Sequence, residues 1–161
     1  MVLHAIIILV SFFCMEFVAW FAHKFVMHGF LWILHHDHHD HSNKTAFEKN
    51  DSFSLIFAIP SWLCMMFGVI DGWDYKFYIG TGILLYGIAY VFVHEIIIHQ
   101  RIKWFTKSNN WYIRGIKRAH KIHHKHIDRF RGECFGMLFV PLKYFKNEGS
   151  KKGELKIKRS L

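Results

Sequence analysis

The sequence predicts an all-α integral membrane protein with three or four transmembrane helices and a histidine-rich cap that binds two metal ions on the cytoplasmic side. Three observations indicate this fold. The 161-residue chain is 52% hydrophobic and has only two prolines, a composition that a soluble domain of this size seldom shows. Its apolar residues form stretches long enough to cross a bilayer. Most of its 14 histidines gather in four short groups beside those stretches.

The first apolar stretch, residues 2–22, is interrupted only by His4, Ser11 and Glu16. At about 1.5 Å per residue, its length matches a hydrocarbon core of roughly 30 Å. A secretory signal would have a basic stretch before the apolar run and a small-residue cleavage site after it, and neither pattern is present. We therefore expect this stretch to be retained as a membrane span.

Two more stretches, residues 53–70 and 77–93, are joined by the short polar turn DGWDYK and predict a helical hairpin. Residues 134–145 are too few to cross unaided and contain Pro141, so they predict a re-entrant or interfacial segment. Residues 146–161 are polar and predict a mobile basic tail. We expect residues 1–161 to form a single membrane domain.

The basic residues predict how the chain is oriented. Of the 21 lysines and arginines, none precedes residue 23, only Lys76 lies in the hairpin turn, and most follow residue 100. Because cytoplasmic loops are enriched in lysine and arginine, the amino terminus and the hairpin turn should face outward. We expect a multi-pass protein of the inner, or plasma, membrane with its histidine groups on the cytoplasmic side.

Ten histidines form four groups, in which the order H-x4-H then H-x2-H-H occurs twice: HKFVMH and HHDHH, then HEIIIH and HKIHH. Neutral imidazole is the commonest metal ligand, and unpaired polar rings beside lipid are costly. The groups therefore predict metal binding. The candidate ligands are His23, His28, His35, His38, His39, His94, His99, His120, His123 and His124.

The two spacings place their histidine rings at different angles around the axis of an α-helix. The three rings of H-x2-H-H lie within about 100° of arc and can approach one metal region. Five positions turn through about 500°, which leaves the rings of H-x4-H about 140° apart. Either a π-bulge realigns these rings or they serve different metal ions, and the spacing alone leaves both alternatives open.

Ten nitrogen ligands exceed the four of a structural zinc site and indicate two ions, while Cys14, Cys64 and Cys134 are too scattered to add thiolates. Imidazole suits iron, copper, nickel and zinc, and zinc can displace ferrous iron in a purified sample. Metal-bound histidine usually donates its other nitrogen to a carboxylate or carbonyl. Candidate partners are Glu16, which is costly inside a span, and Asp37, Asp51 and Glu95.

Five segments carry a resemblance to a known family: MEFVAWFAHKFVMHGFLWILHHDHH, FEKNDSFSLIFAIPS, AYVFVHEIIIHQR, RAHKIHH and FGMLFVP. They resemble the bacterial β-carotene hydroxylases, within the fatty acid hydroxylase superfamily of membrane non-haem di-iron enzymes. The segments cover residues 15–141 with short gaps. The resemblance implies that the ten histidines hold two iron ions.

The resemblance also implies a reaction, in which one oxygen atom of O2 is inserted at carbon 3 of each β-ionone ring. β-Carotene would become β-cryptoxanthin and then zeaxanthin. Ferredoxin and its reductase would supply electrons, since the chain has no flavin, haem or iron–sulfur signature. Side chains suited to an apolar ring in the membrane are Trp20, Phe21, Met27, Phe30 and Trp32.

Three alternatives remain at this stage: a carotenoid ketolase, a lipid desaturase, and a non-enzymatic membrane metal-binding protein. A transporter is disfavoured, because its ligands should lie near the bilayer midplane. Residues 111–131 predict a two-faced interfacial helix whose basic side meets lipid phosphates or an acidic partner. The basic residues flank membrane spans, so we expect no nucleic-acid partner. A homo-oligomer is left open.

Overall fold

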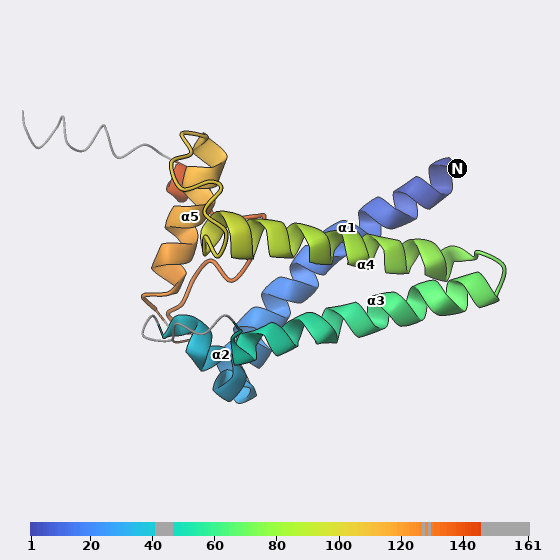
Figure 1. Cartoon of the computed structure of the whole chain (residues 1–161), viewed down its shortest axis with the longest axis horizontal. Coiled ribbons are helices and arrows are strands. Elements are labelled where there is room, and N and C mark those ends of the chain that lie inside the picture. Colours follow the sequence, from blue (N-terminus) through green and yellow to red (C-terminus); the bar gives the residue numbers. More distant parts are fainter. Residues whose placement is uncertain (41–46, 127, 129, 146–161) are drawn as a thin grey trace, which may run out of the picture.

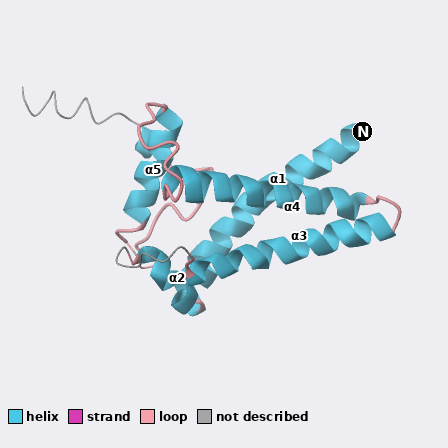
Figure 2. Ribbon diagram, in the orientation of Figure 1, coloured by secondary structure: helices cyan, strands magenta, loops and turns pink. Residues whose placement is uncertain are grey.

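The computed structural model describes residues 1–40, 47–126, 128 and 130–145, and within these ranges every regular element is a helix (Figure 2). Three helices of this part are long and apolar enough to cross a membrane: Val2–Phe30, Lys49–Ile70 and Tyr75–Ile98. The prediction of an all-helical fold with three spans is thereby confirmed. The predicted basic tail, residues 146–161, lies outside the described residues.

Two of the long helices change type before they end. Helix α1 (Val2–Phe21) continues into the π-helix η1 (Ala22–Phe30), and α4 (Tyr75–Tyr90) continues into the π-helix η3 (Val91–Ile98). Helix α3 (Phe53–Ile70) follows a short 3-10 helix, η2 (Lys49–Ser52). The predicted ranges 2–22 and 77–93 end earlier than these helices do, because the histidine-bearing π segments extend them.

The three long helices pack together, with α1 crossing α4 and α3 joined to α4 by a turn (Figure 1). Both α1 and α3 pack against α4. The short helices α2 (Trp32–His39) and α5 (Trp111–His123) gather at the end opposite the amino terminus and the α3–α4 turn (Figure 1). Many large apolar side chains of the long helices are exposed, among them Phe17 and Trp62. Exposed apolar surface of this extent is expected where lipid is the solvent.

The segment after α5 does not form a span. Residues 134–141 are irregular, and they are followed by the 3-10 helix η4 (Leu142–Phe145), which packs against α5. Met137 of this segment joins Met15 and Tyr86 in a small core between α1 and α4. Residues 134–145 therefore form no helix of spanning length, and the chain folds back along α1. That this segment is re-entrant or interfacial stays a prediction.

Glycine brings α1 and α4 into close contact. A Cβ atom added at Gly82 would lie 2.6 Å from the backbone oxygen of Ile8 and 2.6 Å from Cβ of Ser11, whereas one added at Gly87 would meet nothing within 4 Å. Both glycines lie on α4, so they provide a matched pair of positions.

We predict that Gly82→Ala destabilises the protein by about 1–3 kcal/mol through overpacking, while Gly87→Ala is neutral or stabilising because alanine favours helix by about 1 kcal/mol. Thermal unfolding in detergent measures both. Equal unfolding temperatures for the two variants would contradict the close α1–α4 contact.

Candidate metal centre

Nine of the ten candidate histidines converge in two groups at the end of the molecule that carries α2 and α5. In each group, one ring nitrogen per residue lies within 4.8 Å of the corresponding nitrogen of every other member. Group A is formed by His23, His28, His35, His39 and His123, and group B is formed by His38, His94, His99 and His120.

The π-helices explain how each H-x4-H pair meets at one group. The backbone N–H of His99 donates to the carbonyl oxygen of His94 at 2.9 Å, and that of Leu31 donates to Val26 at 3.0 Å. Each of these bonds spans five residues, as in a π-helix, so positions five apart return to the same face. His23 and His28 consequently share group A, and His94 and His99 share group B. The structure selects the π alternative for both pairs.

The H-x2-H-H motifs link the two groups. On α2, His35 and His39 are four residues apart, lie on one face and enter group A, whereas His38 enters group B. On α5 the assignment is reversed: His120 enters group B, and His123 enters group A. Each half of the chain thus completes the group formed by the other half.

His124 is the tenth candidate and belongs to neither group. Its Nε2 atom lies 2.7 Å from Nε2 of His120, and its ring stacks on that of His39 with 4.3 Å between centroids. It lies between the groups. As the last histidine of HKIHH, it corresponds to His39, the last histidine of HHDHH. The remaining described histidines are His4, which stacks on Tyr78, His36, which contacts Trp32, and His126, which is exposed.

The Nδ1 atoms of five rings face outward and are held by acceptors. In group A, His23 donates to the carbonyl oxygen of Phe135 at 2.9 Å, and His35 donates to Oδ1 of Asn50 at 2.6 Å. His123 donates to the carbonyl oxygen of Glu133 at 3.2 Å. When Nδ1 carries the proton of a neutral ring, Nε2 has a free lone pair. These contacts direct the Nε2 atoms into the centre.

In group B, the two Nδ1 acceptors are carboxylates. His38 donates to Oε2 of Glu48 at 2.9 Å, and His94 donates to Oε1 of Glu95 at 2.6 Å. Nε2 of His38 is buried and has no hydrogen-bond partner. A buried ring nitrogen in this state is suited to bind a cation.

The spacing of the Nε2 atoms fits metal coordination. Nε2 of His23 lies 3.1 Å from that of His35, and Nε2 of His99 lies 2.8 Å from that of His120. Two nitrogen ligands about 2.1 Å from one ion and about 90° apart are separated by about 3 Å. Burial lowers the pKa of His35 and of His123 to about 3, which keeps these rings neutral. The donor set therefore fits two nitrogen-bound metal ions.

The predicted carboxylate partners lie in different places. Glu95 contacts His94 directly, while Asp51 binds Arg101 at 3.0 Å and Asp37 accepts a bond from the backbone of Lys49. Neither aspartate contacts a histidine through these bonds. Both instead position the segment that carries Glu48 and Asn50.

Glu16 positions the irregular segment after α5. One carboxylate oxygen accepts bonds from the backbone N–H groups of Met137, Leu138 and Phe139 at 2.9, 2.8 and 3.1 Å. The other accepts from the hydroxyl of Tyr86 at 2.8 Å. The same segment supplies the carbonyl of Phe135 that holds His23. Glu16 therefore acts on His23 indirectly, by fixing the backbone of this segment.

Sequence reasoning did not single out four residues that support the histidines: Glu48, Asn50, Arg101 and Phe135. Glu48 and Asn50 lie within FEKNDSFSL, a segment that carried the family resemblance, but no spacing rule connected them to His38 or His35. Phe135 acts through its backbone carbonyl, for which a sequence has no signal.

Comparison with known proteins identifies the family. The sequence model described as fatty acid hydroxylase matches residues 8–145, which include all four histidine groups. The chain belongs to the fatty acid hydroxylase family. No solved structure shows a significant match.

Curated relatives narrow the comparison within this hydroxylase family. The chain is 35% identical over 138 residues to the β-carotene hydroxylase of Pantoea ananas, covering 86% of this chain and 78% of that protein. It is 32% identical over 140 residues to the β-carotene hydroxylase of Pseudescherichia vulneris, covering 87% and 78%. It is 33% identical over 150 residues to the chloroplastic β-carotene 3-hydroxylase 2 of Arabidopsis thaliana, covering 91% of this chain and 48% of that protein.

We predict that Glu16→Gln lowers stability by about 1–3 kcal/mol, because hydrogen bonds to a buried charged group contribute about that much. It should also reduce metal content, since Phe135 then no longer holds His23 firmly. Tyr86→Phe, which removes only the hydroxyl bonded to Glu16, is the control and should retain its metal. Thermal unfolding and metal analysis measure both effects. Full stability and full metal content in Glu16→Gln would contradict this role.

Proposed function

We propose that the protein is a carotenoid hydroxylase that inserts oxygen from O2 at carbon 3 of β-ionone rings, converting β-carotene through β-cryptoxanthin into zeaxanthin. The observation that carries this proposal is the pair of buried histidine groups at the end of three apolar helices, in a chain similar to β-carotene hydroxylases over most of its length. An apolar substrate dissolved in the bilayer can reach this end without passing through water.

The ten candidate histidines would hold the metal ions, with His124 completing the donor set between the two groups. Two iron ions bound there would supply the activation of O2 and the oxidation of a ring C–H bond. The protein's own part is to hold the imidazoles neutral and oriented. Acceptors on the outer nitrogens of His23, His35, His38, His94 and His123 perform this task, as is usual for metal-bound histidine.

An apolar pocket of about 400 Å³ lies between Trp20 and residues 134–142. Phe135 lines this pocket, and its ring contacts those of His28 and His123 with 5.2 and 5.0 Å between centroids. A ring bound in the pocket would therefore lie one aromatic side chain away from group A. Of the five side chains expected to line such a path, Trp20 lines this pocket.

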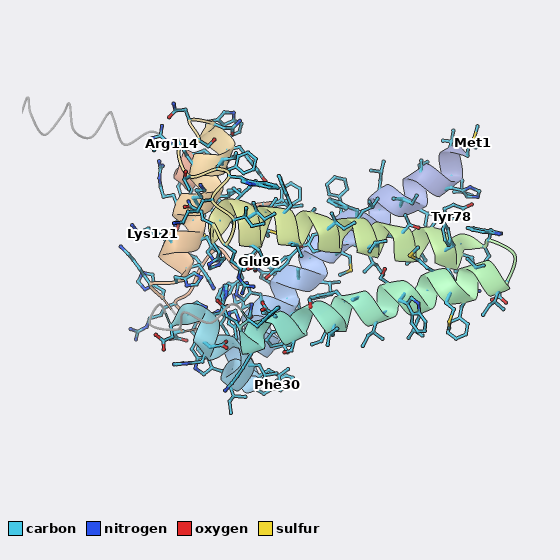
Figure 3. All side chains as sticks on the ribbon, in the orientation of Figure 1. Met1, Phe30, Tyr78, Glu95, Arg114 and Lys121 are labelled. Atoms are coloured by element: carbon cyan, nitrogen blue, oxygen red, sulfur yellow. The ribbon has the colours of Figure 1, made fainter. Side chains whose placement is uncertain are left out.

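We further propose that this end of the protein faces the cytoplasm, at the inner membrane. Arg114 and Lys121 are exposed and project from α5 away from the long helices (Figure 3), while Ile116 and Ala119 on its other face are buried. A basic surface here suits both lipid phosphates and an acidic electron donor. Hydroxylation with O2 requires two electrons and two protons for each oxygen inserted, and ferredoxin with its reductase, which the family resemblance implies, is the proposed donor.

Expression in cells that accumulate β-carotene tests the proposal. We predict that β-cryptoxanthin and zeaxanthin accumulate, as measured by chromatography with mass analysis. His35→Ala should reduce the product at least a hundredfold, because His35 is 1% exposed and lies within group A. His36→Ala, one position away on the same helix and outside both groups, should retain activity. A ketone would indicate a ketolase, a new double bond would indicate a desaturase, and unaltered β-carotene with metal-loaded protein would favour a metal-binding protein without this activity.

A further inference from the structure

The two histidine groups have different electrostatic surroundings. The three group A rings with a defined outer acceptor bind neutral groups, which are the carbonyl oxygens of Phe135 and Glu133 and the amide of Asn50. The ammonium of Lys24 lies 5.6 Å from the centroid of the Phe135 ring, and the carboxylate of Glu133 binds Lys143 and Tyr144. No carboxylate side chain takes part in these three contacts.

Two rings of group B, those of His38 and His94, contact carboxylates. Glu48 and Glu95 accept directly from His38 and His94, and both carboxylates are also bound by Arg101. Nε of Arg101 lies 2.8 Å from Oε2 of Glu95, and a terminal nitrogen of Arg101 lies 3.3 Å from Oε2 of Glu48. Asp51 binds the outer side of the same guanidinium. Glu48, Glu95 and Asp51 thus share one guanidinium beside group B.

The backbone holds Arg101 in this place. Gln100 has a left-handed conformation with φ of 57°, which turns the chain back at the end of η3. The N–H of Arg101 then donates to the carbonyl oxygen of Glu95 at 3.0 Å. The guanidinium is thus fixed beside both carboxylates, so the contacts at His38 and His94 form one connected unit.

We propose that the two metal positions are chemically distinct, with the ion in group B bound more tightly than the ion in group A because Glu48, Glu95 and Arg101 hold His38 and His94. A carboxylate that accepts from the outer nitrogen orients imidazole and makes it a stronger ligand. Arg101 is a positioning residue, because it orients both carboxylates without touching the ion. This inference rests on the proposed metal centre but not on the proposed substrate.

Release of ferrous iron to a colorimetric chelator tests the inference. The full-length protein is loaded anaerobically with two equivalents of ferrous iron, mixed with excess chelator and followed over time. We predict two phases of about one equivalent each. His23→Ala should remove the fast phase, and His94→Ala should remove the slow phase.

Glu95→Gln and Glu48→Gln should each accelerate the slow phase ten- to hundredfold, the usual effect of losing a partner of this kind, and leave the fast phase unchanged. The two substitutions lie on different elements, so they test the same unit independently. Asn50→Asp, which gives His35 in group A a charged acceptor, should slow the fast phase. Asp71→Asn is the matched control, because it removes a carboxylate that binds Lys76 in the distant α3–α4 turn, and it should change neither phase.

A single phase in the unmodified protein would overturn the inference, as would equal acceleration of both phases by Glu95→Gln. The outcome is separable from that of the proposed function. Two phases with the predicted response, in a protein that leaves β-carotene unaltered, would support the inference and contradict the function. Zeaxanthin formation with a single release phase would support the function and contradict the inference.

Discussion

Lone pairs of neutral imidazoles repel one another when they are buried about 3 Å apart, and a cation between them removes the repulsion. This constraint governs the end of the molecule where α2 and α5 meet the long helices. His23 and His35 both have their Nδ1 proton committed to an outer acceptor, so their facing Nε2 atoms cannot form a hydrogen bond with each other. Burial prevents protonation from relieving the repulsion, as the lowered pKa of His35 indicates.

The fold satisfies this constraint with two copies of the same local arrangement. A π-helix at the end of a long apolar helix aligns the first two histidines, and a short helix supplies the rest. Because the middle histidine of each H-x2-H-H motif enters the group of the other copy, neither group is complete without both halves of the chain. Glu16 then connects the segment after α5 to α1 and α4. The two histidine groups and the packing of the helices therefore depend on each other.

Much of this arrangement could be predicted from the sequence, since its signals are local. Apolar length indicated the three helices, and the repeated histidine spacing indicated the candidate ligands. The spacing left the alignment of H-x4-H open, because the choice between an α-turn and a π-turn is made by the backbone around His28 and His99. The exchange of His38 and His123 between the groups depends on how α2 and α5 face each other, which no local pattern encodes.

For the residues that support the histidines, the sequence likewise indicated local features but not long-range partners. Glu16 was conspicuous because a carboxylate in an apolar stretch is costly, yet its partners Met137, Leu138 and Phe139 are more than 100 residues away and are backbone groups. Asp51 was expected to contact a histidine, whereas it binds Arg101, which in turn holds Glu48 and Glu95. Long-range contacts of this kind become visible only when the chain is folded.

Metal analysis of the purified protein, combined with X-ray absorption at the edge of the bound metal, tests the central claim most directly. The account predicts two ions per chain, each coordinated mainly by imidazole nitrogen at about 2.1 Å, and loss of ions when His38 or His123 is replaced by alanine. A protein that takes up no metal, or whose ions are coordinated mainly by oxygen or sulfur, would contradict it.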